Sequence, residues 1–274
     1  MTIDTWLHEA TTQLESLGIN SARLDAELIL ANTLRKDRTY LHAHSDEVID
    51  PRRRDIADAR LSLRRDRVPL AYILGYKEFY GRRFSVSPKV LVPRPESEDC
   101  IHVLLEHAPI DDKSRTLIDI GSGSGCLGIT AKLELPANWH VILSDISADA
   151  LVVAKKNAET LQASVFTQKQ SLLFGQYEPL DCIVANLPYV DKSWPDTSPE
   201  LRHEPQEALY ADEGGLKLIR QLIRQAPHHL KPGGLLILEA DPEQHQTIIA
   251  FGKQQGMAHS ATRGFAVLLH YTSD

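Results

Sequence analysis

The sequence predicts an α/β protein with a mostly parallel sheet covered by helices on both faces, preceded by a small helical domain and a linking β-hairpin. From about Ile101 onward, short apolar runs alternate with amphipathic segments, which indicates strands alternating with helices. The strand segments are nearly continuous apolar runs, which is typical of strands buried on both faces. Before Val68 the apolar residues instead recur at helical spacing.

Residues 1–75 are expected to form the helical domain. Four apolar residues of "TWLHEATTQLESLG" recur at three- and four-residue spacing: Trp6, Ala10, Leu14 and Leu17. The segment "SARLDAELILANTLR" repeats this pattern, and "DPRRRDIADARLSLRRD" predicts another helix. That helix opens on Asp50 and Pro51, the residue types preferred at the N-cap and at the first helical position.

Residues 76–97 are expected to form the hairpin linker and residues 98–274 the larger domain. The aromatic and β-branched stretch "EFYGRRFSVSPKVLVPRPE" has Gly81 at the expected turn position of a hairpin. Strands are expected in "TLIDIGSGSG", "HVILSDIS", "SVFTQKQS", "DCIVANLPYV", "GGLLILEAD" and "FAVLLHY". Helices are expected in "CLGITAKLEL", "ADALVVAKKNAETL", "GGLKLIRQLIRQAPHHL" and "QHQTIIAFGKQQG".

The composition narrows the classes of protein. A net charge of −7 and a pI of about 5.9 disfavour an extended nucleic-acid-binding surface. The cysteines Cys100, Cys126 and Cys182 have no metal-like spacing, so we expect reduced core thiols and no metal. Neither a signal peptide nor a membrane span is evident, and we therefore expect a cytoplasmic protein that does not bind membranes.

The glycine-rich turn "DIGSGSG" between a predicted strand and helix indicates a ligand site. Gly121, Gly123 and Gly125 permit a tight turn and a close approach of the backbone to a ligand at the carboxyl edge of the sheet. Their spacing is G-x-G-x-G, which differs from the dinucleotide fingerprint G-x-G-x-x-G, and no phosphate-binding Lys-Ser pair follows.

The next predicted strand ends on Asp145, twenty residues after Gly125. A carboxylate there can accept hydrogen bonds from both ribose hydroxyls of a nucleoside. A site for a nucleoside that has no phosphate-binding motif beside it predicts S-adenosyl-L-methionine as the ligand. Asp119 is placed to hold the ammonium group of this ligand. The candidate cofactor-binding residues are Asp119, Gly121, Ser122, Gly123, Ser124, Gly125, Asp145, Ile146, Leu172, Leu173 and Asn186.

The predicted strand "DCIVANLPYVD" ends on a polar and aromatic motif of four candidate catalytic residues: Asn186, Leu187, Pro188 and Tyr189. Proline restricts its predecessor to extended geometry, so the Leu187 carbonyl should project. This carbonyl and the Asn186 side-chain oxygen can accept the two N–H groups of a planar NH2 donor, on which Tyr189 can stack. Such acceptors favour a pyramidal nitrogen whose lone pair attacks a sulfonium methyl group, so that positioning supplies most of the rate.

The chain resembles the HemK/PrmC-like glutamine methyltransferases of peptide chain release factors over nearly its whole length. The resemblance is carried by "ARLDAELILANTL", by "RVPLAYILGYKEFYGRRFSVSPKVLVPRPESE", by "DIGSGSG", by "NLPY" for the family's Asn-Pro-Pro-Tyr, by "EPQEALYADEGGL" and by "LKPGGLLILEAD". It implies a Rossmann-like class I methyltransferase with a mostly parallel seven-stranded sheet. It also implies that the helical domain helps to bind the substrate protein. We further expect that no particular oligomer is required.

By this resemblance the substrate is the glutamine side-chain amide in the Gly-Gly-Gln loop of a release factor. Three positions depart from the family pattern: Leu187 stands for a proline, Leu172 for a frequent aspartate near the adenine, and Ala240 follows Glu239 where glycine is usual. Three alternatives stay open: a glutamine methyltransferase of a ribosomal protein, an adenine-amine DNA methyltransferase, and a non-catalytic binding module.

Overall fold

The computed structural model describes residues 1–194 and 198–272, which form two compact units. The smaller unit comprises Met1–Tyr76 together with the distant segment Ser198–His203. The larger unit comprises the rest of the described chain from Lys77 onward. The chain therefore leaves the smaller unit after Tyr76, contributes Ser198–His203 to it again, and continues in the larger unit from Glu204.

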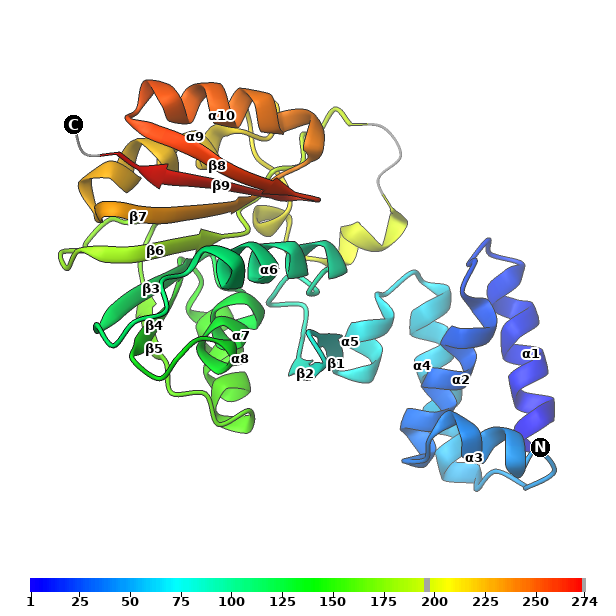
Figure 1. Ribbon diagram of the computed structural model, residues 1–274. Helices are drawn as coiled ribbons and strands as arrows, with labels where there is room; N and C mark the ends of the chain where they lie inside the picture. Colours follow the sequence, from blue (N-terminus) through cyan, green and yellow to red (C-terminus); the bar gives the residue numbers. More distant parts are fainter. Residues whose placement is uncertain (195–197, 273–274) are drawn as a thin grey trace. The chain divides into compact units, whose positions relative to one another are not determined.

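The smaller unit is a bundle of short helices around one apolar core (Figure 1). Its helices are α1 (Ile3–Glu15), α2 (Ala22–Leu34), α3 (Arg38–Ala43), α4 (Pro51–Arg65) and α5 (Leu70–Leu74). Trp6, Ala10 and Leu14 are buried as the spacing predicts, but Leu17 is 41% exposed because α1 ends at Glu15. The predicted start of α4 is confirmed, since the Asp50 side chain accepts the N–H of Arg53 and Pro51 is the first helical residue.

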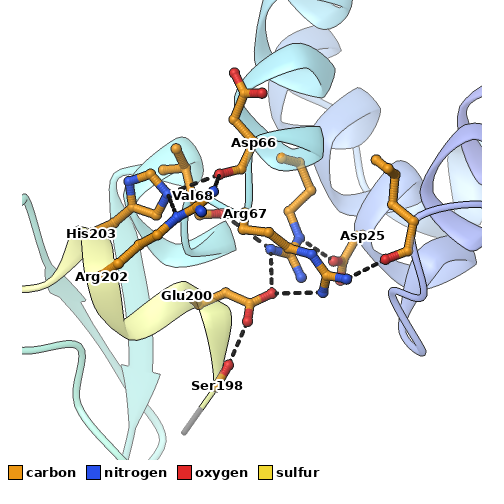
Figure 2. A network of polar contacts seen from close by, with 10 residues as sticks. Asp25, Asp66, Arg67, Val68, Ser198, Glu200, Arg202 and His203 are labelled. Carbon is orange, nitrogen blue, oxygen red and sulfur yellow. Dashed lines mark hydrogen bonds and ion pairs between the residues drawn. The ribbon is translucent and has the colours of Figure 1, made fainter.

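The segment Pro199–His203 is a short 3-10 helix that docks on this bundle (Figure 2). The Arg64 guanidinium lies between two carboxylates, 2.6 Å from Asp25 Oδ2 and 2.9 Å from Glu200 Oε1. Burial opposes ionisation of Glu200, but hydrogen bonds from Ser198 and Arg64 outweigh it and lower its pKa to about 2. The segment is thus held by charge pairing, across a sequence separation of 136 residues for Arg64 and Glu200.

Replacing Arg64 with alanine should destabilise the smaller unit strongly. Arg64 and Asp25 are both buried, so the substitution leaves the Asp25 carboxylate without its cation. Breaking a buried pair by removing one partner costs about 3–5 kcal/mol. The matched control is Arg54→Ala in the same helix, whose contacts with Asp55 and Asp58 are long and solvent-exposed. Urea unfolding should show that the control lowers the free energy of unfolding by less than about 1 kcal/mol. An equal decrease in both variants would refute the assignment.

The larger unit contains a two-stranded hairpin and a seven-stranded sheet, as expected. The hairpin strands are β1 (Tyr76–Phe79) and β2 (Arg82–Ser85), with the turn at Gly81. The strands of the main sheet are β3 (Arg115–Ile120), β4 (Trp139–Asp145), β5 (Phe166–Lys169), β6 (Leu180–Ala185), β7 (Leu230–Glu239), β8 (Met257–Arg263) and β9 (Ala266–Tyr271). Their order is β5-β4-β3-β6-β7-β9-β8, parallel from β5 to β7 and antiparallel beyond.

Helices cover both faces of the main sheet (Figure 1). They are α6 (Glu98–His107), α7 (Cys126–Glu134), α8 (Ala148–Thr160), α9 (Lys217–Gln225) and α10 (His245–Gln254). Alternate residues of β6 enter two different cores: Cys182 and Val184 pack with α6, α7 and α8, whereas Ile183 and Ala185 pack with α9 and α10. This burial on both sides explains the continuous apolar strand sequences.

Two elements of the larger unit were not predicted. Helix α6 buries Cys100, Ile101, Val103 and Leu104 at helical spacing, a pattern that the sequence contains but that lies beside the apparent domain boundary. Strand β8 is an edge strand whose residues are mostly exposed, so hydrophobic patterning gives no signal for it. The hairpin residues Phe79 and Phe84 are fully buried in the core that includes α6, so the hairpin packs as part of the larger unit.

The sheet topology creates a crevice where β3 and β6 lie side by side. The chain runs outward from β3 to β4 and β5, then returns to β6 on the other side of β3. Ile120 and Ala185, the last residues of β3 and β6, are paired in register. In open α/β sheets, ligands bind at the carboxyl ends of strands at such a switch point.

Candidate functional site

The glycine turn begins directly after β3 and is fixed to the end of β4. The N–H groups of Gly121 and Ser122 both donate to the Ser144 carbonyl, at 2.8 and 2.9 Å. Gly125 has a φ of 81° and caps α7, and a Cβ atom there would lie 2.8 Å from Ile129 Cδ1. Glycine is required at this position both for its backbone conformation and for space.

Asp119, the penultimate residue of β3, is buried at the floor of the turn. Its Oδ2 atom accepts the N–H of Gly128 at 2.8 Å, which leaves the second oxygen able to accept another donor. Burial raises the pKa of Asp119 to about 7 despite this hydrogen bond, and the negative charge of Asp145 adds to the rise. A bound cation would restore its ionised form, so the carboxyl group suits a cationic ligand.

Asp145 ends β4 and ties two loops together. Its Oδ2 accepts the N–H of Gly123 at 2.9 Å, and its Oδ1 accepts the N–H of Ser147 at 2.8 Å. A carboxylate has about four acceptor sites, so both oxygens can still receive hydroxyl donors. Asp145 therefore serves the loop structure and remains available to a ligand.

A single pocket collects most of the predicted site residues, all of them in the larger unit. It is lined by Asp119, Gly121, Ser122, Gly123, Ser124, Asp145, Ile146, Leu172, Asn186, Leu187 and Pro188. Three predicted residues do not line it: Gly125 caps α7, Leu173 is in the core, and Tyr189 points its hydroxyl toward Glu239. The end of β3, the end of β4 and the motif after β6 thus meet around one cavity.

Two further segments line this pocket, and the sequence did not predict them as part of the site. One runs from Lys89 to Arg94 after the hairpin, and the other includes Pro205, Glu207 and Ala208. Glu204 joins them, since its buried carboxylate accepts the Val92 N–H at 3.0 Å and the Arg94 guanidinium at 2.6 Å. Both segments belong to stretches that carry the family resemblance, but only the fold places them next to each other.

The motif after β6 is packed tightly against its neighbours. The Leu187 side chain is buried, and its Cδ2 would lie 3.3 Å from a Cβ atom on Gly121. The Tyr189 carbonyl accepts Gln244 Nε2 at 2.9 Å. A Cβ atom on Gly215 would lie only 1.9 Å from the same carbonyl oxygen. The backbone of the motif therefore has a defined position relative to the glycine turn and the C-terminal helices.

A polar cluster lies behind the motif. Asn186 Nδ2 donates to Ser97 Oγ at 3.1 Å, and the Tyr189 hydroxyl donates to Glu239 Oε1 at 3.3 Å. Burial, together with the nearby Glu239 charge, raises the pKa of Tyr189 well above its usual value. Tyr189 is consequently a neutral hydrogen-bond donor and not a general base at physiological pH.

The pocket fits a nucleoside that bears a cationic amino-acid chain. Ser122 Oγ is buried and has no hydrogen-bond partner within the described part of the chain, so a ligand hydroxyl or ammonium group would satisfy it. Asp119 and Asp145 supply carboxylates at two separate strand ends, and the positive-φ glycines Gly121 and Gly123 leave the backbone accessible. These groups match the donors of S-adenosyl-L-methionine: an ammonium group and two ribose hydroxyls.

Other kinds of site were sought over residues 1–194 and 198–272. No helix there is long and apolar enough to cross a membrane. Within the same residues, no group of three or more His, Cys, Asp or Glu side chains is arranged to hold a metal ion. The three cysteines are free thiols, of which Cys100 and Cys182 are buried and Cys126 is partly buried, and desolvation raises the pKa of Cys126 to about 12.

Comparisons with known proteins identify the family to which the chain is similar. Residues 5–75 match the family "PrmC N-terminal domain" and residues 97–268 match the family "Methyltransferase small domain". A "Release factor glutamine methyltransferase" of Deinococcus radiodurans is 38% identical over 247 residues, covering 89% of this chain and 87% of that protein. One of Salmonella typhimurium is 34% identical over 266 residues, covering 96% and 94%.

Solved structures share the fold at low sequence identity. A methyltransferase from Pyrococcus furiosus has a TM-score of 0.53 at 18% identity, covering 79% of this chain and 98% of that one. The 16S rRNA N2 G1207 methyltransferase of Thermus thermophilus, in complex with AdoMet and guanosine, also has a TM-score of 0.53, at 14% identity, covering 72% and 50%. The fold is therefore that of the class I methyltransferases.

Proposed function

The chain belongs to the release factor glutamine methyltransferases, and from this we propose that it methylates the glutamine side-chain amide in the Gly-Gly-Gln loop of a peptide chain release factor. The observation that carries the proposal is the position of Asn186 and Leu187 in the wall of the pocket that also contains Asp119 and Asp145. An acceptor pair for an NH2 group thus lies beside a site suited to the methyl donor.

The methyl donor is S-adenosyl-L-methionine, which supplies a methyl group activated by a cationic sulfur. In our proposal, Asp145 accepts the ribose hydroxyls, Asp119 accepts the ammonium group, and Ser122 supplies a further hydrogen bond. The same two carboxylates also accept backbone N–H groups, Asp145 from Gly123 in the glycine turn and Asp119 from Gly128 in α7, so they serve both ligand binding and local structure.

The motif residues act on the substrate amide. The Asn186 Oδ1 atom and the Leu187 carbonyl accept its two N–H groups, which holds the nitrogen toward the pocket and reduces delocalisation of its lone pair. A proline at position 187 is unnecessary for this role, because only the backbone carbonyl of Leu187 is used. No strong base is required, since a proton can leave after transfer, and fixed dipoles supply most of the rate.

A panel of methyl acceptors distinguishes the proposed function from the alternatives. The protein is incubated with labelled S-adenosyl-L-methionine and either a release factor, ribosomal proteins or an adenine-containing DNA duplex. We expect label in the release factor and at most background label in the other two acceptors. Preferential labelling of a ribosomal protein or of DNA would replace the proposal, and cofactor binding without any transfer would favour the non-catalytic reading.

The Asp145→Ala substitution should lower cofactor affinity at least about 10-fold, because hydrogen bonds to a charged acceptor contribute about 1.5–3 kcal/mol each. Since Asp145 also holds Gly123 and Ser147, a control must separate ribose contacts from loop support. Titration calorimetry with S-adenosylhomocysteine and its analogue lacking the ribose hydroxyls does so. The wild type should bind the analogue more weakly than S-adenosylhomocysteine, whereas the variant should bind the two compounds equally well. If loss of the ribose hydroxyls lowered affinity equally in both proteins, the ribose assignment would be refuted.

We propose that the helical unit binds the release factor, in line with the match of residues 5–75 to the PrmC N-terminal domain. A fragment from Lys77 to the C-terminus retains all of the hairpin except Tyr76, and every pocket residue named above. It should bind the cofactor with an affinity close to that of the full chain, yet have a KM for the release factor raised about 10-fold or more. Equal KM values for fragment and full chain would contradict this role.

The remaining features of the proposal concern location and assembly. We propose that the enzyme works in the cytoplasm, where release factors act, without stably binding nucleic acid and without requiring an oligomer. The net charge of −7 supports the absence of an extended nucleic-acid surface.

A further inference from the structure

The carboxyl group of Glu239, at the end of β7, lies directly behind the catalytic motif and is not used by the mechanism above. Its side chain is 1% exposed. Oε1 accepts the Tyr189 hydroxyl at 3.3 Å, while Oε2 is buried and lacks a partner within the part of the chain that the structure describes. Buried carboxylates of this kind are costly, so an unsatisfied oxygen beside an active site calls for a function.

Ser97 is the nearby side chain that can donate to this carboxylate. In the hydrogen bond with Asn186, Ser97 Oγ is the acceptor, so the Ser97 hydroxyl proton remains to be donated. The Ser97, Tyr189 and Asn186 side chains are close enough to Glu239 to lower its pKa, in opposition to the rise caused by burial. Hydrogen bonds in ligand-free active sites are often long and shorten when substrate binds. A hydrogen bond from the Ser97 hydroxyl to Glu239 would complete a chain from Asn186 through Ser97 to Glu239.

This chain decides which end of the Asn186 amide faces the pocket. The two ends have nearly the same shape, so the neighbouring donors and acceptors set the orientation. An ionised Glu239 can only accept, which directs the Ser97 proton toward it and makes Ser97 Oγ an acceptor for Asn186 Nδ2. Oδ1 of Asn186 is then available to accept from the substrate NH2 group. In the reverse orientation, Nδ2 of Asn186 would face the substrate NH2 group, and both are donors.

We propose that Glu239 is a positioning residue, whose ionised carboxylate fixes Asn186 through Ser97 and holds the Tyr189 ring through its hydroxyl. One buried group thereby sets the geometry of both polar side chains of the motif. This inference rests on the proposed function, because it assigns the orientation that methyl transfer to an amide requires.

The proposal has a definite pH dependence. Burial, aided by the nearby carboxylate of Glu96, raises the pKa of Glu239 to about 7 against the lowering effect of hydrogen bonds from Ser97, Tyr189 and Asn186. The other titratable groups that interact with Glu239 are the Tyr189 hydroxyl and the Cys100 and Cys126 thiols, whose pKa values are all raised, so they stay neutral. Protonated Glu239 would become a donor to Ser97, which could then donate to Asn186 Oδ1 and reverse the amide. Transfer should therefore fall as the pH decreases through the pKa of Glu239.

The first test uses Glu239→Gln and Ser97→Ala, with Asp181→Asn as the control. Asp181 is a part-buried carboxylate at the opposite end of β6, where it accepts Arg115 and the N–H of Thr116. At saturating cofactor and release factor, kcat should fall about 10- to 100-fold for Glu239→Gln and Ser97→Ala, with cofactor affinity within about 3-fold of wild type. The acidic limb of the kcat profile should disappear in Glu239→Gln and persist in Asp181→Asn. An unchanged acidic limb in a folded Glu239→Gln variant, or full activity of Ser97→Ala, would overturn the proposal.

A second readout does not depend on methyl transfer. In the cofactor-free protein, the side-chain NH2 resonances of Asn186 should shift with pH around 7 in the wild type and lose this step in Glu239→Gln. The pKa of Asp119 is also raised to about 7, so a pH step in the Asn186 resonances could arise from either carboxyl group. Loss of the step in Glu239→Gln would assign it to Glu239. A pH-independent Asn186 signal, or a step retained in Glu239→Gln, would refute the inference even if the release factor proved to be the wrong substrate. Conversely, failure of wild-type protein to methylate a release factor, with the step present, would refute only the proposed function.

Discussion

Asn186→Ala should slow methyl transfer to a release factor about 10²–10³-fold while leaving cofactor affinity nearly unchanged. The substitution removes one of two fixed acceptors for the substrate amide, and a fixed transition-state hydrogen bond of this kind contributes roughly 3–4 kcal/mol. Asn186 follows β6 and lines the pocket, so its truncation should leave the sheet intact. Single-turnover transfer, measured with calorimetric cofactor binding, separates the chemical step from binding.

Two related variants make this test specific. Asn186→Asp keeps an acceptor and should retain partial activity. Leu187→Pro should be tolerated, because the backbone carbonyl at position 187 is the only group asked to act. Near-normal transfer by Asn186→Ala, or abolished transfer by a well-folded Leu187→Pro, would contradict the proposed mechanism.

Gly215→Ala should reduce transfer by about 10²-fold or more through displacement of the motif. A Cβ atom at position 215 would lie 1.9 Å from the Tyr189 carbonyl oxygen and 2.7 Å from Gln244 Nε2, and the φ of Gly215 is +80°. The backbone of Tyr189 must therefore move, and a displacement of about 1 Å at a reacting centre costs on the order of 10²-fold. Methyl transfer and thermal unfolding are measured on the same preparation.

Gly214→Ala is the matched control. Gly214 also has a positive φ, +67°, but a Cβ atom there would meet nothing within 4 Å. Both variants carry the backbone strain of a left-handed non-glycine residue, about 1–2 kcal/mol, so they should lose similar stability from that source. If Gly214→Ala lost as much activity as Gly215→Ala, strain in the loop rather than contact with the motif would explain the effect.

The parts of the site that were predicted from sequence follow strand ends directly. Asp119 and the glycine turn follow one apolar run, Asp145 closes the next, and Asn186 follows a third. Carboxyl ends of parallel strands meet at one edge, so local patterns were sufficient to place these residues around a common ligand. The apolar runs were also continuous enough to predict most strands of the main sheet.

The remaining parts depend on long-range packing. The pocket walls after the hairpin and near Pro205 are brought together by Glu204, 110 residues from Arg94 in sequence. Glu200 pairs with Arg64, but both are charged residues of a kind usually found on the surface. Nothing in the sequence around either residue indicates that they form a pair. Strand β8 is polar because it is an edge strand, and its pairing with β9 provides the structure that its own sequence does not indicate. Neither composition nor periodicity contains this information.

The most direct test of the central claim is a single-turnover reaction between the full chain, labelled S-adenosyl-L-methionine and a purified release factor, followed by mass mapping of the labelled residue. We predict one methyl group on the side-chain nitrogen of the glutamine in the Gly-Gly-Gln loop. A release factor with that glutamine replaced should receive none. Label at another residue, or equal label in the factor that lacks the glutamine, would contradict the proposed function.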